Sequence, residues 1–229
     1  PISELCYFLD DVLLASLTVE EHIRKLELVL EKFKSANLKL TPSKTELLKR
    51  EVKFVGLTIS ADGLRITSDR VQAIQDLQPP RNVKQVQKVM GFFGYNRKFV
   101  KDYARIAKPL YALLNKDSKF VWTERCQESF DLLKQRIADS VTLCIPDVDD
   151  PDESFHVTID ASNLGYGATL SQIRNGERRV CAYFSKAVPP YKKMWGATKL
   201  EFMAMFHAIE HWRIYSVSYT HLRAHETRE

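Results

Sequence analysis

Two adjacent carboxylates near the start of the chain are the residues best suited to chemistry. Asp10 and Asp11 follow a short apolar run in Phe8-Leu-Asp-Asp11 and precede another, which predicts a hairpin with both aspartates at its tip. Mg²⁺ prefers hard oxygen ligands of this kind together with substrate phosphates. Two such ions can activate an attacking hydroxyl and stabilise a leaving group. Aspartates are also common in turns for hydrogen-bonding reasons alone, so the pair by itself leaves both interpretations open.

A second group of residues suits binding rather than catalysis. The stretch from Arg81 to Lys119 holds ten lysines and arginines but only two acids, Asp102 and Asp117, a net charge of +8. Such a block favours a polyanion such as nucleic acid, although an ordinary solvated helix face explains the charge equally well. The candidate contacts are the basic residues Arg81, Lys84, Lys88, Arg97, Lys98 and Lys101.

The sequence of the first third of the chain predicts short strands and one helix around Asp10 and Asp11. An amphipathic helix is expected from about Val19 to Ala36, because apolar residues recur there at spacings of three and four. A strand pair is expected over residues 52–59 and 64–66, around the turn-forming dipeptide Asp62-Gly63.

The basic stretch predicts a helical segment. Ser68 or Asp69 would cap a short helix before Pro79-Pro80. One longer helix is expected from about Val83 to Tyr103, in which Gly91 and Gly94 indicate a kink or a close backbone contact. Its inward-facing residues would be Val86, Val89, Met90, Phe93 and Val100. Thr123 opens another helix, which buries Phe130, Leu133 and Ile137.

The remaining sequence predicts a linker and a second sheet. Residues 145–153 form an acidic, proline-bearing stretch, the best domain boundary in the chain. Alternation from Phe155 to Asp160 predicts a half-buried strand. Two further strands follow, Gly165 to Gln172 and Val180 to Lys186, with a turn at Asn175-Gly176, and then a helix from about Thr198 to Tyr215.

Composition bounds the class of protein. The chain has 229 residues, of which 45% are hydrophobic and 28% charged, which is typical of a globular protein with a buried core. No apolar run approaches the roughly 20 residues of a membrane span, and the first residues do not form a signal peptide. Its four cysteines lack metal-binding spacing, which indicates free thiols in a reducing, cytoplasmic compartment.

A series of motifs in fixed order resembles the polymerase and RNase H region of gypsy-type LTR retrotransposon Pol polyproteins. The resemblance covers about residues 4–215. It rests on the FLDD hairpin, Asn37 to Lys44, Phe54-Val-Gly-Leu57, Pro79-Pro80, Met90 to Val100, Lys108-Pro-Leu110, Phe120-Val-Trp-Thr123, Phe130 to Lys134, Phe155 to Gln172 and Trp212-Arg213.

The resemblance implies roles for particular residues of the polymerase half. Asp10 and Asp11 match the catalytic aspartates of the palm, and Phe8 stands where the family more often has Tyr. Lys44 matches a lysine near the incoming nucleotide, although a solvated loop lysine is the plain alternative. Phe54 to Leu57 match a strand that grips the primer end, where Gly56 would let the backbone approach nucleic acid.

The same resemblance assigns two carboxylates to RNase H. Asp160 matches the metal-binding aspartate of the first strand, and Glu201 matches a glutamate on the following helix. Thr198 and Glu201 also form the sequence pattern of a capping box, which is the structural alternative. Ala204 and Ala208 share the face of Glu201 and would let this helix lie close to the sheet.

The expected fold is α+β. It comprises the C-terminal part of a polymerase palm (1–66), a thumb- or connection-like helical segment (67–144), the linker (145–153), a partial RNase H-like α/β domain (154–215) and a tail outside the family pattern (216–229). The family's remaining carboxylates for both sites fall outside this pattern, so the polypeptide alone is expected to lack robust activity.

The implied function is that of an RNA-directed DNA polymerase with ribonuclease H. The implied cofactor is Mg²⁺ or Mn²⁺, and the implied partners are an RNA template, a DNA primer, their hybrid, deoxynucleotides and the rest of the Pol polyprotein. The parent element would work in the cytoplasm, a virus-like particle or the nucleus. The alternative is a non-catalytic nucleic-acid-binding remnant that uses only the basic segment.

Overall fold

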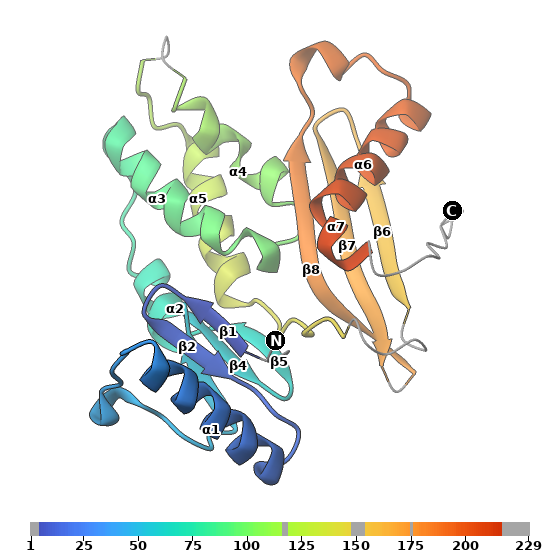
Figure 1. Ribbon diagram of the computed structural model, residues 1–229. Helices are drawn as coiled ribbons and strands as arrows, with labels where there is room; N and C mark the ends of the chain where they lie inside the picture. The colour runs from blue at the N-terminus through green and yellow to red at the C-terminus, as the bar shows by residue number, and fades with distance from the viewer. Residues whose placement is uncertain (1–4, 116–118, 148–153, 175, 217–229) are drawn as a thin grey trace. The chain divides into compact units, whose positions relative to one another are not determined.

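The computed structural model describes residues 5–115, 119–147, 154–174 and 176–216 (Figure 1). The chain divides into two compact units, Pro1–Ala61 and Asp62–Glu229. The predictions for residues 148–153 of the linker, for Asn175 and for the tail from 217 onward lie outside the described residues. Within the described residues, no helix combines the length and apolar character needed to span a membrane.

The first unit begins with the expected hairpin. Strands β1 (Leu5–Phe8) and β2 (Asp11–Leu14) pair antiparallel, with Phe8 opposite Asp11. Helix α1 (Val19–Ser35) follows, as predicted. The Thr18 hydroxyl accepts a hydrogen bond from the Glu21 amide, and the Glu21 carboxylate accepts one from the Leu17 amide. The first bond satisfies an amide that a helix start leaves unpaired, and the second ties the residue before the cap to the first turn.

The single strand predicted over residues 52–59 is wrong. The chain turns at Val55 and Gly56, so that β3 (Glu51–Phe54) pairs antiparallel with β4 (Leu57–Ser60). Both turn residues have positive φ, 49° and 73°, as a two-residue type I′ turn requires. Valine rarely adopts this conformation, and its usual preference for strands hid the turn in the sequence.

In the second unit, β5 (Gly63–Ile66) leads into helix α2 (Ser68–Gln75), whose N-cap position is Thr67 rather than Ser68 or Asp69. The long helix predicted from Val83 to Tyr103 is wrong in extent. It is divided into α3 (Val83–Tyr95), the 3-10 turn η2 (Arg97–Phe99) and α4 (Tyr103–Ala112).

Two residues account for the break between α3 and α4. Asn96 ends α3, where its side-chain amide donates to the Phe92 carbonyl. Asp102 adopts a positive φ of 59° immediately before α4. A Cβ added to Gly91 would meet nothing, and one added to Gly94 would only touch the Tyr103 hydroxyl. Neither helix glycine therefore marks a close backbone crossing.

The helical core forms as the apolar periodicity predicts. Phe93 of α3 packs against Phe130 of α5 (Glu124–Ala138), with ring centroids 5.8 Å apart, and Trp122 meets Phe130 edge-on. The Thr123 side chain caps α5, as expected. The predicted inward residues are all buried: Val86, Val89, Met90, Phe93, Val100, Phe130, Leu133 and Ile137.

A three-stranded antiparallel sheet forms the last part of the unit. It consists of β6 (Phe155–Ala161), β7 (Gly165–Arg174) and β8 (Glu177–Ala187) in the order β6-β7-β8. A 3-10 turn, η3 (Pro190–Lys192), leads to helix α6 (Ala197–His211), which packs on one face (Figure 1). The predicted helix to Tyr215 is interrupted at Trp212, after which α7 (Arg213–Ser216) begins.

The segment Leu143–Asp147 is held at three points along its length. Leu143 exchanges backbone hydrogen bonds with Leu64 of β5, and the Cys144 amide donates to Val180 of β8. The side chain of Gln172, fully buried in β7, accepts from the Asp147 amide and donates to the Asp147 carbonyl. The described start of the expected linker is therefore anchored to the sheet.

Replacing Gln172 with leucine should remove both hydrogen bonds that its side chain makes to the Asp147 backbone. Because each such hydrogen bond contributes about 0.5–1.5 kcal/mol to stability, we expect Gln172→Leu to lower the free energy of unfolding by about 1–3 kcal/mol. Gln75→Leu, at an exposed position of α2, is the matched control. Urea denaturation followed by circular dichroism measures both variants. Equal midpoints for Gln172→Leu and the unsubstituted chain would contradict this prediction.

Candidate functional site

The aspartate pair lies where the sequence predicts it. The register that places Phe8 opposite Asp11 leaves Leu9 and Asp10 as a two-residue turn. Both aspartates are exposed, and Leu9 is held at a positive φ of 53°. A leucine in this region is unusual and indicates a tightly constrained tip. The hairpin thus presents two neighbouring carboxylates to solvent, which confirms their predicted placement.

Neither Lys44 nor the turn at Gly56 is joined to that pair by a described interaction. Lys44 ends the 3-10 turn η1 (Pro42–Lys44) and is exposed. The described ion pairs and hydrogen bonds include none between its side chain and Asp10 or Asp11. Phe54 is half-buried at the end of β3, directly before the Val55-Gly56 turn. The expected primer-gripping strand is therefore the tip of a second hairpin.

Most of the candidate nucleic-acid contacts are exposed in the helical segment. Lys84 and Lys88 lie one turn apart on α3, and Arg81 immediately precedes that helix. Arg97 and Lys101 are also exposed. Lys98 is half-buried, and this burial lowers the pKa of its ammonium group. Asp102 is ion-paired with Arg105 at 3.0 Å.

Asp160 lies on the face of the sheet opposite α6. Its neighbours Ile159 and Ala161 pack toward Leu200 and Ala204 of α6, so the alternation of a strand turns Asp160 the other way. Register places Asp160 beside Gly167. It also places Gly167 beside Ser185, so these three residues form a row across β6, β7 and β8.

The start of α4 is held over this row. The Ser185 hydroxyl accepts a hydrogen bond of 2.9 Å from the Ala104 amide and so caps a helix 81 residues earlier in the chain. A Cβ built on Gly167 would lie 3.4 Å from the Asp102 carboxylate oxygen Oδ1 and 3.8 Å from the Asp160 Cβ. A side chain at Gly167 would therefore contact both aspartates above β7.

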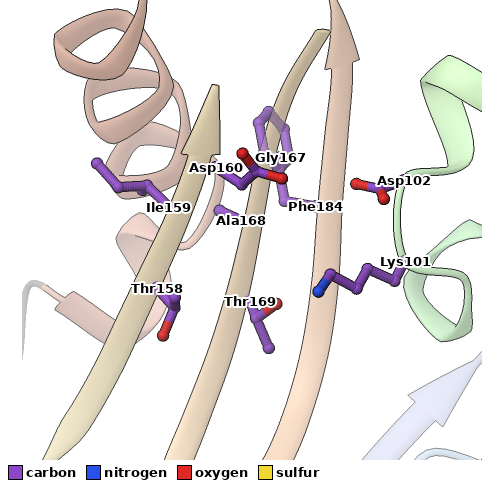
Figure 2. A pocket seen from close by; sticks show the side chains of 9 residues that line it. All are labelled: Lys101, Asp102, Thr158, Ile159, Asp160, Gly167, Ala168, Thr169 and Phe184. Carbon is purple, nitrogen blue, oxygen red and sulfur yellow. The ribbon is translucent and has the colours of Figure 1, made fainter. Parts of the chain in front are cut away.

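A small cavity forms between the sheet and the turn before α4 (Figure 2). Its charged residues are Asp160 of β6 and Lys101 and Asp102 from the turn before α4, and Thr158 and Thr169 add hydroxyl groups. The Asp160 and Asp102 carboxylates point into the same space, and Lys101 extends over the sheet toward Thr169. The sequence indicates Asp160 as a metal-binding residue and Lys101 as a nucleic-acid contact. It gives no signal that the two residues line the same cavity.

Glu201 lies elsewhere on the domain. It is exposed on α6 and does not line the cavity. Gly196 is the N-cap position of α6, so Thr198 lies inside the helix and the capping-box alternative does not form. Ala204 and Ala208 are fully buried against the sheet, as predicted. A metal-bridging approach of Glu201 to Asp160 stays a prediction.

The donor chemistry of both places fits a hard divalent cation. Asp10 with Asp11, and Asp160 with Asp102 across Gly167, each provide carboxylate oxygens, the ligands that Mg²⁺ takes together with water and phosphate oxygens. Residues 5–115, 119–147, 154–174 and 176–216 contain no group of three or more acidic, histidine or cysteine side chains arranged to hold a metal. Neither place is therefore a closed metal cage.

Comparison with protein families identifies both halves. Residues 3–59 match the family described as reverse transcriptase (RNA-dependent DNA polymerase). Residues 122–222 match the RNase H-like domain found in reverse transcriptase. The chain therefore carries a reverse transcriptase segment followed by an RNase H-like domain, which agrees with the fold and confirms the expected class.

The curated relatives are retroelement polyproteins. The chain is 34% identical over 226 residues to the retrovirus-related Pol polyprotein from transposon opus of Drosophila melanogaster, covering 93% of this chain and 22% of that protein. It is 35% identical over 210 residues to that from transposon 297 of the same organism, covering 91% and 19%. These homologues are Pol polyproteins of LTR retrotransposons, and the chain corresponds to a fragment that spans about a fifth of their length.

Solved structures show the same fold. The chain superposes on a foamy viral protease-reverse transcriptase dRH in complex with ds DNA, with a TM-score of 0.83 and 24% identity, over 94% of this chain and 38% of that one. For the foamy viral protease-reverse transcriptase in complex with RNA/DNA hybrid, the TM-score is 0.79, also at 24% identity, over 93% and 28%.

Proposed function

We propose that these residues serve an RNA-directed DNA polymerase and a ribonuclease H that act within one Pol polyprotein. The observation that carries the proposal is the exposed Asp10-Asp11 hairpin tip inside the segment that matches reverse transcriptases. The RNase H-like sheet supports the second activity because it presents Asp160 on an exposed surface. The proposed compartment is the cytoplasm, a virus-like particle or the nucleus.

In the polymerase, Asp10 and Asp11 would hold Mg²⁺ or Mn²⁺. The bound ions would lower the pKa of the primer 3′-hydroxyl and neutralise the leaving pyrophosphate. Lys44 would neutralise charge on the incoming deoxynucleotide. Phe54 and Gly56 would contact the primer end, where the glycine lets the backbone approach nucleic acid. The partners are an RNA template, a DNA primer and deoxynucleotides.

In the ribonuclease, Asp160 and Glu201 would be the metal-binding carboxylates. Asp160 would orient the ion and its water toward a phosphate of the RNA strand, and Glu201 would approach from α6. The hybrid would be held by the basic residues Arg81, Lys84, Lys88, Arg97, Lys98 and Lys101. The two solved relatives bound to ds DNA and RNA/DNA hybrid support nucleic acid as the partner. The remainder of the Pol polyprotein is a further proposed partner.

Binding of an RNA–DNA hybrid by the 229-residue chain should depend steeply on salt. Each phosphate that a basic side chain neutralises contributes a slope of about −0.9 in log affinity against log salt, so three contacts predict a roughly 40-fold loss for a fourfold rise in salt. The measurement is fluorescence anisotropy with a labelled hybrid.

Matched variants separate the basic segment from the rest of the surface. Lys84→Gln with Lys88→Gln should reduce the slope by about 2, because two phosphates are then left without a basic partner. Lys193→Gln with Lys199→Gln, which removes the same charge at exposed positions outside the segment, should leave the slope unchanged. An affinity that ignores salt would overturn the prediction.

Catalysis can be tested by exchanging residues 5–216 into the matching stretch of the transposon opus relative. Asp11→Asn should abolish primer extension with Mg²⁺ or Mn²⁺ but spare hybrid cleavage, and Asp160→Asn or Glu201→Gln should do the reverse. Losing one positioned catalytic group typically costs a factor of about 10² to 10⁴. Each variant's retained activity shows that it is folded, and Asp76→Asn is the control.

The alternative function, non-catalytic binding of nucleic acid, predicts the opposite result when residues 5–216 are exchanged in this way. If the chain serves only to bind nucleic acid, primer extension and hybrid cleavage will both be absent while hybrid binding remains. Cleavage that survives both Asp160→Asn and Glu201→Gln would instead remove those two residues from the ribonuclease site.

A further inference from the structure

Lys101 and Asp160 lie 59 positions apart in the sequence yet line the same cavity (Figure 2). Lys101 belongs to the basic helical segment, and Asp160 belongs to the RNase H-like sheet. Both side chains are exposed, so a ligand at the surface of the domain can reach each of them. The geometry thus joins a residue suited to a phosphate with a residue suited to a metal or a hydroxyl group.

The backbone that carries Lys101 is fixed on both sides. Val100 is 1% exposed and Tyr103 is 3% exposed, so each anchors the turn in the helical core. The Ser185 hydroxyl holds the next turn of chain through the Ala104 amide. The fixed turn sets where the Lys101 side chain begins, so its ammonium stays within reach of the cavity that the side chain lines.

The charges of the cavity are not fully matched internally. Asp102 is paired with Arg105. No ion pair between the Lys101 ammonium and the Asp160 carboxylate occurs among the residues that the structure describes. A ligand that satisfies both groups must carry an anion and also a cation or a hydrogen-bond donor. A nucleic-acid backbone with its bound divalent ion has this combination.

We propose that Lys101 is a positioning residue that holds a backbone phosphate of the hybrid strand beside Asp160. The inference rests on the proposed ribonuclease function and adds to it a contact from outside the RNase H-like domain. The compact ammonium provides three donors and offsets the repulsion between the phosphate and the carboxylates of Asp160 and Asp102. Lys101 thereby differs from the other basic residues, which act through overall charge.

A double-mutant cycle on the 229-residue chain tests this contact. Affinity for a labelled RNA–DNA hybrid is measured in Mg²⁺ for the unsubstituted chain, Lys101→Gln, Asp160→Asn and the double variant. If both residues meet the same phosphate and ion, their effects are coupled, by about fivefold in affinity. Lys101→Arg should retain most of the affinity. Lys108→Gln, an exposed charge of α4 outside the cavity, should combine additively with Asp160→Asn.

The outcomes separate this inference from the function on which it rests. Additive effects of Lys101→Gln and Asp160→Asn in a chain that binds hybrid with steep salt dependence would overturn the role of Lys101 alone. Failure of the unsubstituted chain to bind hybrid at all would overturn the proposed function as well. Because both side chains are exposed, all variants should keep the melting temperature of the unsubstituted chain.

Discussion

The hydrogen bond from the Ala104 amide to the Ser185 hydroxyl is the constraint on which the functional surface depends. Asp102 adopts positive φ and makes no capping hydrogen bond, so the first turn of α4 takes its cap from the sheet instead. That cap brings Lys101 and Asp102 over the row formed by Asp160, Gly167 and Ser185. Gly167 fits this arrangement because a Cβ there would lie 3.3 Å from the Asp160 carbonyl oxygen, which is tight, and would touch the Asp102 carboxylate at 3.4 Å.

Local sequence signals predicted most elements but missed the breaks between them. The helix expected from about Val19, the start of a helix at Thr123, the apolar periodicity of α3 and α5, and the alternation of β6 all describe the observed structure. The turn at Val55 was missed because valine at positive φ opposes its own propensity, and tertiary packing must enforce it. The break before α4 was missed because Asp102 adopts a positive φ there and the cap of α4 comes from Ser185, far along the chain.

The residues of the candidate sites also differ in how well the sequence could place them. Asp10 and Asp11 could be placed from the sequence because one tight turn determines their surroundings. The face on which Asp160 lies follows from strand alternation, but its neighbours Lys101 and Asp102 come from another element and only the fold reveals them. Small buried Ala204 and Ala208 predicted the close packing of α6, yet helix and aspartate occupy opposite faces of the sheet.

The measurement that tests the account most directly is the location of Mn²⁺ in crystals of the chain. The anomalous signal should show an ion at the Asp160 carboxylate, on the sheet face that also carries Lys101, and the ion should be lost in Asp160→Asn. A saturated crystal with Mn²⁺ bound elsewhere and none at Asp160 would contradict the claim that this face forms the hydrolytic site.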